Sequence, residues 1–142
     1  MKIKDIMTNN VVSVKLETPI TEVTKIIKDN NVGSVPVCDG QRVVGIVTDR
    51  DIVLRGIAMD KDINTLKAKD VMTAKVTTVD SNSDVNSASN IMAEKQIRRL
   101  PVVDGNNLVG IVSIGDIAVR NSLQDDAGDA LSDISKPSNS LF

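Results

Sequence analysis

The chain has 142 residues, with 17 lysines and arginines against 19 aspartates and glutamates, one cysteine, one phenylalanine, and no histidine, tryptophan or tyrosine. Without histidine, the sequence excludes a Ser-His-Asp triad, a Cys-His couple and any zinc site that needs imidazole. A net charge of −2 and a lack of internal aromatic residues argue against nucleic acid as a partner. Acid/base work would fall to carboxylates or lysine, and neither a metal cluster nor a nucleophile-base pair is visible in the sequence, so we predict that the chain is not an enzyme.

Other features concern the cellular compartment and metals. No apolar run approaches the roughly 20 residues that span a bilayer, and the first ten residues lack an apolar signal core. The lone Cys38 cannot close an intramolecular disulfide and is expected to be a small core residue. We expect a cytoplasmic protein with no membrane partner. No metal site is predicted, since Asp125, Asp126 and Asp129 lack the spacing of a calcium loop and fit a solvated helix face.

The chain is a tandem duplication. Adding 65 to a residue number maps Lys4–Thr8 onto Lys69–Thr73 and Val44–Thr48 onto Val109–Ser113, without a gap. We predict a first repeat over residues 1–60, a linker over 61–68, a second repeat over 69–122, and a C-terminal helix and tail over 123–142.

The first repeat begins with a predicted strand over Val11–Val14. Thr18 is the expected helix cap and Pro19 the first-turn residue of a helix of about three turns, with an apolar stripe at helical spacing. Two further strands are predicted, joined at Asp39-Gly40, and a helix follows. The stripe is Ile20, Val23, Ile26 and Ile27; the strands are Ser34–Cys38 and Val43–Thr48; the helix runs from about Asp49 to Met59.

The second repeat has the same order of elements. Ser83 is the expected cap, Asp104-Gly105 is the turn, and Val85, Ala88, Ile91 and Met92 form the stripe. Beyond it, Ala130, Leu131 and Ile134 indicate a last helix, and residues 136–140 a frayed tail. The predicted fold class is α+β: tandem β-α-β-β-α repeats, each too small for a stable core alone, packed with pseudo-twofold symmetry into one module with two equivalent clefts.

A hydroxyl residue followed three positions later by aspartate ends each repeat's third strand. Thr48 precedes Asp51, and Ser113 precedes Asp116. One interpretation is a capping box that satisfies backbone N–H groups at a helix start. The other is a ligand site, in which the helix start and hydroxyl attract an anion and the carboxylate accepts from a ribose diol. The pattern alone favours capping, and its duplication strengthens the second interpretation.

These motifs resemble the CBS (cystathionine-beta-synthase) domain pair over residues 1 to about 120. The resemblance lies in the paired Asp-Ile/Val-Met-Thr starts, the two strands that contain Val35-Pro36-Val37 and Leu100-Pro101-Val102, and the Gly-Ile-Val-Thr/Ser-x-x-Asp-Ile endings. It is closest to small stand-alone bacterial pairs. The resemblance implies a regulatory module that binds AMP, ADP or ATP between the repeats and dimerises into a disc of four repeats.

The resemblance also assigns site residues. In one cleft it places Ser113 near phosphate and Asp116 on the ribose hydroxyls; in the other, Thr48 and Asp51 take these roles. The residues around base and sugar are Thr18, Val23, Gly33 and Ile111 in the first cleft, and Ser83, Ala88, Ile97 and Ile46 in the second.

Phosphate charge is expected to be balanced by arginine. The second repeat has Arg98-Arg99 where the first has Gly33-Ser34, and Arg50 is the first repeat's candidate. A helix end supplies about half a positive charge, so guanidinium groups are the expected balance for a phosphate. The alternative is that Arg98 and Arg99 form a solvated strand edge.

Two functions follow from the sequence. The leading hypothesis is a non-enzymatic adenine-nucleotide sensor that responds to cellular energy state, a homodimer that acts on a regulated protein. The alternative is a ligand-free structural or protein-interaction dimer module. No catalytic residue and no catalytic cofactor are predicted.

Overall fold

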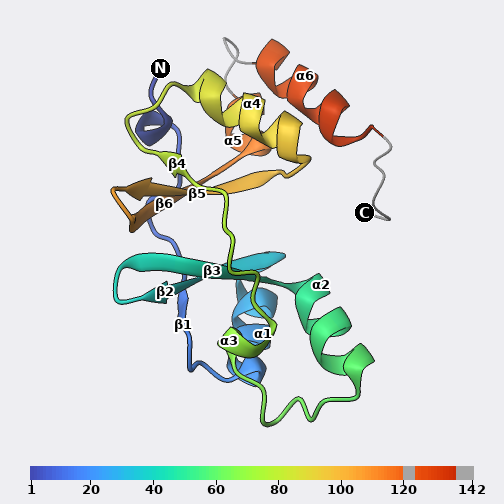
Figure 1. Ribbon diagram of the computed structural model, residues 1–142. Coiled ribbons are helices and arrows are strands. Elements are labelled where there is room, and N and C mark those ends of the chain that lie inside the picture. The colour runs from blue at the N-terminus through green and yellow to red at the C-terminus, as the bar shows by residue number, and fades with distance from the viewer. Residues whose placement is uncertain (120–123, 137–142) are drawn as a thin grey trace. The chain divides into compact units, whose positions relative to one another are not determined.

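The computed structural model describes residues 1–119 and 124–136, and it confirms the α+β fold class (Figure 1). Of the predicted tail, only Lys136 lies within the described residues. The described chain divides into two compact units: unit 1 holds residues 1–11, 77–105 and 109 onward, and unit 2 holds residues 12–76 and 106–108. The first eleven residues therefore belong to the unit that is built from the second repeat. The repeat boundaries themselves stay a prediction.

Unit 2 contains three neighbouring strands of the sheet, and β2 lies between the other two. β1 (Val14–Lys15) pairs parallel with β2 (Ser34–Asp39), and β3 (Arg42–Thr48) pairs antiparallel with it. The predicted turn between β2 and β3 is confirmed, because Asp39 pairs with Arg42 and Gly40 adopts φ +63°. A positive φ at the first central residue of a two-residue hairpin turn favours glycine.

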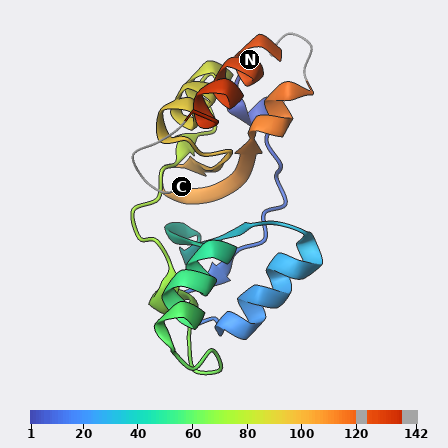
Figure 2. The same cartoon turned by 90° about the vertical axis from the view of Figure 1, so that its right-hand side faces the viewer.

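The helices of unit 2 lie on one side of the β2–β3 hairpin in both ribbon views (Figures 1 and 2). α1 (Ile20–Asn30) has the predicted three turns. The predicted helix over 49–59 is also present, but its hydrogen bonding changes along its length, from α2 (Asp49–Asp51) through a π-helical turn, η2 (Ile52–Gly56), to a 3-10 turn, η3 (Ile57–Met59).

The segment after the first repeat's last helix returns to the same unit. It contains α3 (Ala68–Val71), and the Ala68 N–H donates to the Thr18 carbonyl at 2.8 Å. Ile46 and Thr73 then exchange both backbone hydrogen bonds, at 3.0 and 2.9 Å. This segment thereby extends the sheet beside β3.

Unit 1 repeats this arrangement with residues 1–11 in the matching role. η1 (Ile3–Asp5) takes the place of α3, and Thr8 and Ile111 exchange hydrogen bonds at 2.8 and 3.0 Å. Its sheet has β5 (Arg99–Asp104) between β4 (Val79–Asp80) and β6 (Asn107–Ser113). β6 begins with residues that unit 2 contains, where Arg42 pairs with Asn107.

Three helices cover one side of this sheet in both ribbon views (Figures 1 and 2). They are α4 (Val85–Lys95), α5 (Ile114–Ala118) and α6 (Gln124–Ile134). Ala130 is buried and Ile134 packs on the core, as the predicted last helix requires, whereas Leu131 is exposed. Asp129 is exposed, and the side chains of Asp125 and Asp126 lie outside the described residues.

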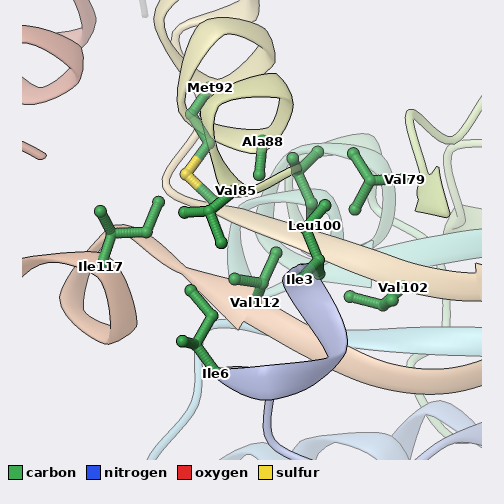
Figure 3. Packing of buried hydrophobic residues seen from close by; sticks show 10 residues of the cluster. All are labelled: Ile3, Ile6, Val79, Val85, Ala88, Met92, Leu100, Val102, Val112 and Ile117. Carbon is green, nitrogen blue, oxygen red and sulfur yellow. The ribbon is translucent and has the colours of Figure 1, made fainter. Parts of the chain in front are cut away.

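Each unit has its own aliphatic core. The predicted stripe of α4 is buried at three of its four residues and packs against strand and η1 side chains (Figure 3). The core of unit 1 consists of Ile3, Ile6, Val79, Val85, Ala88, Met92, Leu100, Val102, Val112 and Ile117. The core of unit 2 consists of Val14, Ile20, Val23, Val35, Val37, Val47, Ile52, Leu66, Ala68 and Val71.

Three local predictions were wrong. The strand predicted over Val11–Val14 begins only at Val14. Thr18 does not cap α1, because its hydroxyl accepts from the Lys15 N–H at 2.9 Å and closes the preceding turn, which leaves Pro19 at the cap position. Ser83 does not cap α4, because the side chain of the next residue, Asp84, accepts from the Asn86 N–H at 2.9 Å.

Cys38 is buried, as predicted for a small core residue, and this burial raises the pKa of its thiol. No helix among the described residues is long and apolar enough to span a membrane.

An exposed ion-pair cluster joins the loop before α1 to the start of α3. Glu17 accepts from the Nζ groups of Lys67 and Lys69, each at 2.8 Å, and these hydrogen bonds lower the pKa of Glu17 from 4.5 to about 2. A carboxyl group whose pKa is lower in the folded state stabilises the fold at pH values above its unfolded pKa. This stabilisation is lost as the pH falls through the folded pKa. The contribution is therefore complete above about pH 5 and is lost between pH 4.5 and 2.

We expect Glu17→Gln to be less stable than the wild type at pH 7 and equally stable near pH 2. Thermal unfolding followed by circular dichroism across this range tests the expectation. Because the cluster is exposed, 1 M NaCl should shrink the difference at pH 7. A difference that persists unchanged at pH 2 would show that Glu17 acts through packing instead of charge.

Candidate functional site

The hydroxyl-aspartate motif of unit 2 forms a reciprocal capping box at the junction of β3 and α2. The Thr48 N–H donates to Asp51 Oδ2 at 3.0 Å, and the Asp51 N–H donates to Thr48 Oγ1 at 3.0 Å. Both residues are half-buried. The capping interpretation is thus confirmed, and the box fixes a carboxylate at the point where the strand ends.

Unit 1 has the same box at the junction of β6 and α5. The Ser113 N–H donates to Asp116 Oδ2 at 2.8 Å, and the Asp116 N–H donates to Ser113 Oγ at 3.1 Å. These residues are also half-buried. Each box uses one carboxylate oxygen, and an ionised carboxylate offers about four acceptor positions, so capping and ribose binding are chemically compatible.

A backbone hydrogen bond places the residue before each central strand beside the box. The Ile114 N–H donates to the Arg98 carbonyl at 2.9 Å, and in unit 2 the Asp49 N–H donates to the Gly33 carbonyl at 3.0 Å. Arg98 therefore lies next to the residue that follows Ser113. In unit 1, the backbone of Arg98 is thus fixed beside the strand–helix junction that carries the hydroxyl and the carboxylate.

The basic candidates are all exposed. Arg98 precedes β5 and Arg99 is its first residue, while Arg50 lies on α2, where its backbone N–H donates to Asp49 Oδ1 at 2.8 Å. The exposed guanidinium groups of Arg98 and Arg99 are accessible to an anion, and they also fit the alternative of a solvated strand edge. The two interpretations differ in whether a bound anionic ligand contacts these arginines.

The predicted base and sugar residues differ in accessibility. Val23 and Ala88 are fully buried in the cores of units 2 and 1. The remaining candidates are half-buried, apart from the exposed Gly33: they are Thr18, Ile46, Ser83, Ile97 and Ile111. The resemblance assigns residues from both units to each cleft.

Backbone groups of two predicted base contacts are already engaged. Ile46 exchanges hydrogen bonds with Thr73, and Ile111 does so with Thr8. The N–H groups of both isoleucines are therefore not free to donate to a base, whereas their side chains can pack against one. Sequence reasoning missed this role of Thr8 and Thr73, although the repeated motif Lys-Asp-Ile/Val-Met-Thr, which contains both, was visible.

Arg55 is a further residue of this region that the sequence reasoning did not single out. It follows Asp51 by one helical turn, and its Nε lies 3.9 Å from Asp51 Oδ1. The signal that points to it is a duplicated Asp-Ile-x-x-Arg, since Asp51 and Arg55 recur as Asp116 and Arg120. Arg120 lies outside the described residues.

Groups of three or more Cys, Asp or Glu side chains that could hold a metal ion do not occur in the part of the chain that the structure describes.

Comparison with known proteins identifies the class. The CBS domain model matches the chain twice, at residues 3–63 and 68–120. The chain therefore belongs to the CBS domain family and carries a tandem pair of these domains, as the motifs predicted.

Individual relatives cover most of the chain. The CBS domain-containing protein YhcV of Bacillus subtilis is 43% identical over 133 residues, which are 94% of each chain. The structure of Hypoxic Response Protein I with two coordinated zinc ions is 36% identical and covers 84% of this chain and 98% of its own, with a TM-score of 0.78. The CBS domain pair of MJ0100, solved in complex with 5′-methylthioadenosine and S-adenosyl-L-methionine, is 29% identical and covers 83% and 93%, with a TM-score of 0.73.

Proposed function

We propose that this chain is a non-enzymatic regulatory module that binds an adenine nucleotide, AMP, ADP or ATP, in clefts between its repeats and responds to cellular energy state. Asp51 and Asp116 accept from the ribose hydroxyls, Thr48 and Ser113 donate to phosphate, and Arg50, Arg98 and Arg99 balance the phosphate charge. The supporting observation is the duplicated box, which presents a half-buried carboxylate beside a hydroxyl at both strand–helix junctions.

The MJ0100 complex adds support from outside the chain. Its two ligands both contain adenosine, so a CBS pair of similar fold accepts this group. The other base and sugar contacts of the proposal are Thr18, Val23, Gly33, Ile46, Ser83, Ala88, Ile97 and Ile111. Of these, Val23 and Ala88 require a local opening of the core, because both are fully buried.

Ligand binding is tested by thermal shift. A ligand at 100 times its Kd should add about 2.7 kcal/mol to the free energy of unfolding. AMP, ADP, ATP, NAD, 5′-methylthioadenosine and S-adenosylmethionine are compared at equal ionic strength. An unmoved melting temperature with all of them would contradict the proposal.

Asp116→Ala is expected to abolish binding at one site and spare the other, and Asp51→Ala to do the reverse. Each variant loses the reciprocal half of one capping box, in which the aspartate accepts the N–H of the cap residue, Thr48 or Ser113. Asp51→Ala also loses the contact with Arg55. Calorimetric titration with AMP reads the number of sites and the affinity of each. Equal losses at both sites in either variant would show that the assignment of carboxylates to separate clefts is wrong.

The second candidate function is a ligand-free interaction module, and one observation favours it. Four large apolar side chains are exposed on the helical segment 52–59 of unit 2, with exposed fractions between 44% and 64%: Val53, Leu54, Ile57 and Met59. Apolar surface of this kind marks a protein–protein contact and does not require a bound nucleotide. Native mass spectrometry after gentle purification separates the two functions, since a dimer with bound nucleotide and an empty dimer differ by a discrete mass.

A further inference from the structure

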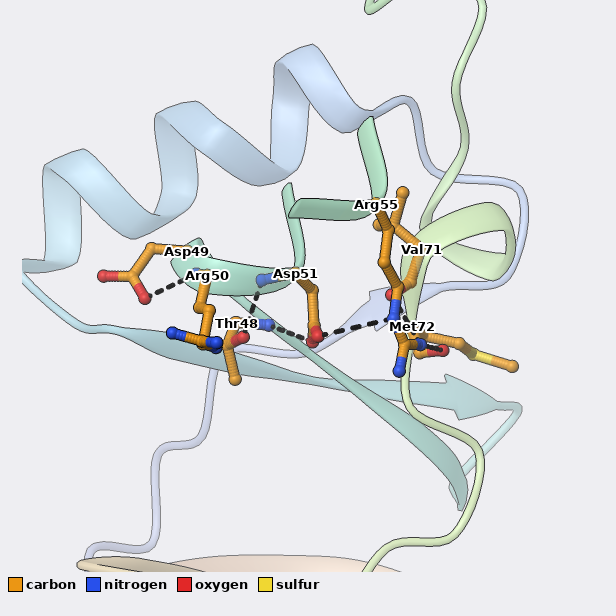
Figure 4. Close-up of polar contacts among 7 residues, drawn as sticks. All are labelled: Thr48, Asp49, Arg50, Asp51, Arg55, Val71 and Met72. Carbon is orange, nitrogen blue, oxygen red and sulfur yellow. Dashed lines mark hydrogen bonds and ion pairs between the residues drawn. The ribbon is translucent and has the colours of Figure 1, made fainter. Parts of the chain in front are cut away.

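Arg55 makes contacts in two directions from the π-helical turn η2. Its Nη1 donates to the Met72 carbonyl at 2.9 Å and lies 3.4 Å from the Val71 carbonyl, while its Nε faces Asp51 Oδ1 at 3.9 Å (Figure 4). Val71 is the last residue of α3, so Arg55 satisfies carbonyls that a helix C-terminus leaves without an internal partner. One guanidinium group thus joins α3 to the aspartate of the capping box.

The two oxygens of Asp51 have separate partners in this arrangement. Oδ2 accepts the Thr48 N–H, and Oδ1 faces Arg55. The Asp51 side chain is 14% exposed and that of Arg55 is 51% exposed, so the carboxylate is the more enclosed member of the pair. A hydrogen bond to one oxygen and a cation beside the other both restrict rotation of the carboxylate, while acceptor positions remain on each oxygen.

The local backbone supports this role. In η2 the Ile57 N–H bonds the Ile52 carbonyl, five residues earlier, and such π-helical turns occur frequently at functional sites. The Asp-Ile-x-x-Arg sequence that produces the pair occurs in both repeats.

We propose that Arg55 is a positioning residue for Asp51, and that it fixes the carboxylate against the C-terminal end of α3 in the orientation that accepts the ribose hydroxyls of the ligand. This inference rests on the proposed function. Under this proposal, Arg55 does not touch the ligand. It determines how strongly the site distinguishes a ribose from a sugar that lacks the 2′ and 3′ hydroxyls.

The test compares AMP with 2′,3′-dideoxyadenosine 5′-monophosphate, which lacks both hydroxyls. Titrations use the full chain with Asp116→Ala, so that the Asp51 site is the intact one. Arg55→Met is expected to weaken AMP binding about three- to fivefold, the range of a part-exposed ion pair, and to change binding of the dideoxy nucleotide less than twofold. Arg42→Met, which removes an exposed arginine of the same unit, should change neither.

The outcomes separate the two proposals. If the parent chain prefers AMP and Arg55→Met keeps that preference, or loses affinity for both nucleotides equally, the positioning role is overturned while the proposed function stands. If the parent chain binds neither nucleotide, the proposed nucleotide site fails.

A ligand-free measurement then decides whether Arg55 positions the carboxylate. In Arg55→Met, amide hydrogen exchange of Thr48, which donates to Asp51 Oδ2, should accelerate several-fold relative to Ser113, its counterpart in unit 1. If the ratio of the Thr48 exchange rate to the Ser113 exchange rate is the same before and after the substitution, the inference is overturned.

Discussion

Gly110→Ala is expected to lower the free energy of unfolding by about 1–3 kcal/mol, the usual cost of overpacking. A Cβ built at Gly110 would lie 2.5 Å from Met7 Sδ and 2.9 Å from the Thr8 carbonyl oxygen. The thioether can move, but the carbonyl is held by its hydrogen bond with Ile111. The substitution therefore loosens the attachment of residues 1–8 to β6, and urea unfolding followed by circular dichroism measures the loss.

Two other glycines provide matched controls for this substitution. At Gly45 the corresponding distances are 2.5 Å to Met72 Sδ and 3.1 Å to the Thr73 carbonyl oxygen, so Gly45→Ala should cost less than Gly110→Ala. At Gly128, within α6, a Cβ meets nothing within 4 Å, and Gly128→Ala should stabilise by about 0.5–1 kcal/mol through helix propensity. A Gly110→Ala variant as stable as the wild type would show that the backbone of residues 7–8 yields freely.

Leu100→Ala is expected to cost about 2–5 kcal/mol, because it removes a fully buried side chain from the core of unit 1 and leaves a cavity. With a typical total stability of about 5–15 kcal/mol, this is a large fraction of the whole. The melting temperature and the urea midpoint should both fall sharply.

Leu131→Ala is the control, since this leucine is 44% exposed on α6 and its truncation should change stability by less than about 0.5 kcal/mol. Equal costs for Leu100→Ala and Leu131→Ala would mean that the core of unit 1 is not where the structure places it.

Patterns within one element were the most predictable part of the fold. The helical spacing of Val85, Ala88 and Met92 fixes which face of α4 is buried, and the glycines after Asp39 and Asp104 locate both hairpin turns. Helix starts were less predictable, because several polar residues compete for each cap. Thr18 instead closes a turn with Lys15, and Asp84 replaces Ser83, and both choices depend on backbone positions that the sequence does not show.

The capping boxes followed from the sequence because Thr48 and Asp51, or Ser113 and Asp116, interact within one turn. Contacts between segments that are far apart in the chain could not be predicted from the sequence. The bond from Arg55 to the Met72 carbonyl joins residues 17 apart in sequence, and no periodicity predicts it. The repeat also does not reveal on which copy a flanking segment packs, so the placement of Ile3 in the core of unit 1 needed the structure.

The assignment of residues 1–11 to unit 1 has a consequence for the order of folding. Unit 2 is nearly continuous along the chain, whereas unit 1 joins residues 1–11 to a segment that begins at Thr77. During synthesis, Ile3 and Ile6 therefore emerge well before α4 and β6, which they need for burial, and most of unit 2 is complete in the meantime. Closing so long a loop slows folding more than it reduces final stability, so we expect unit 2 to form first and unit 1 to set the overall rate.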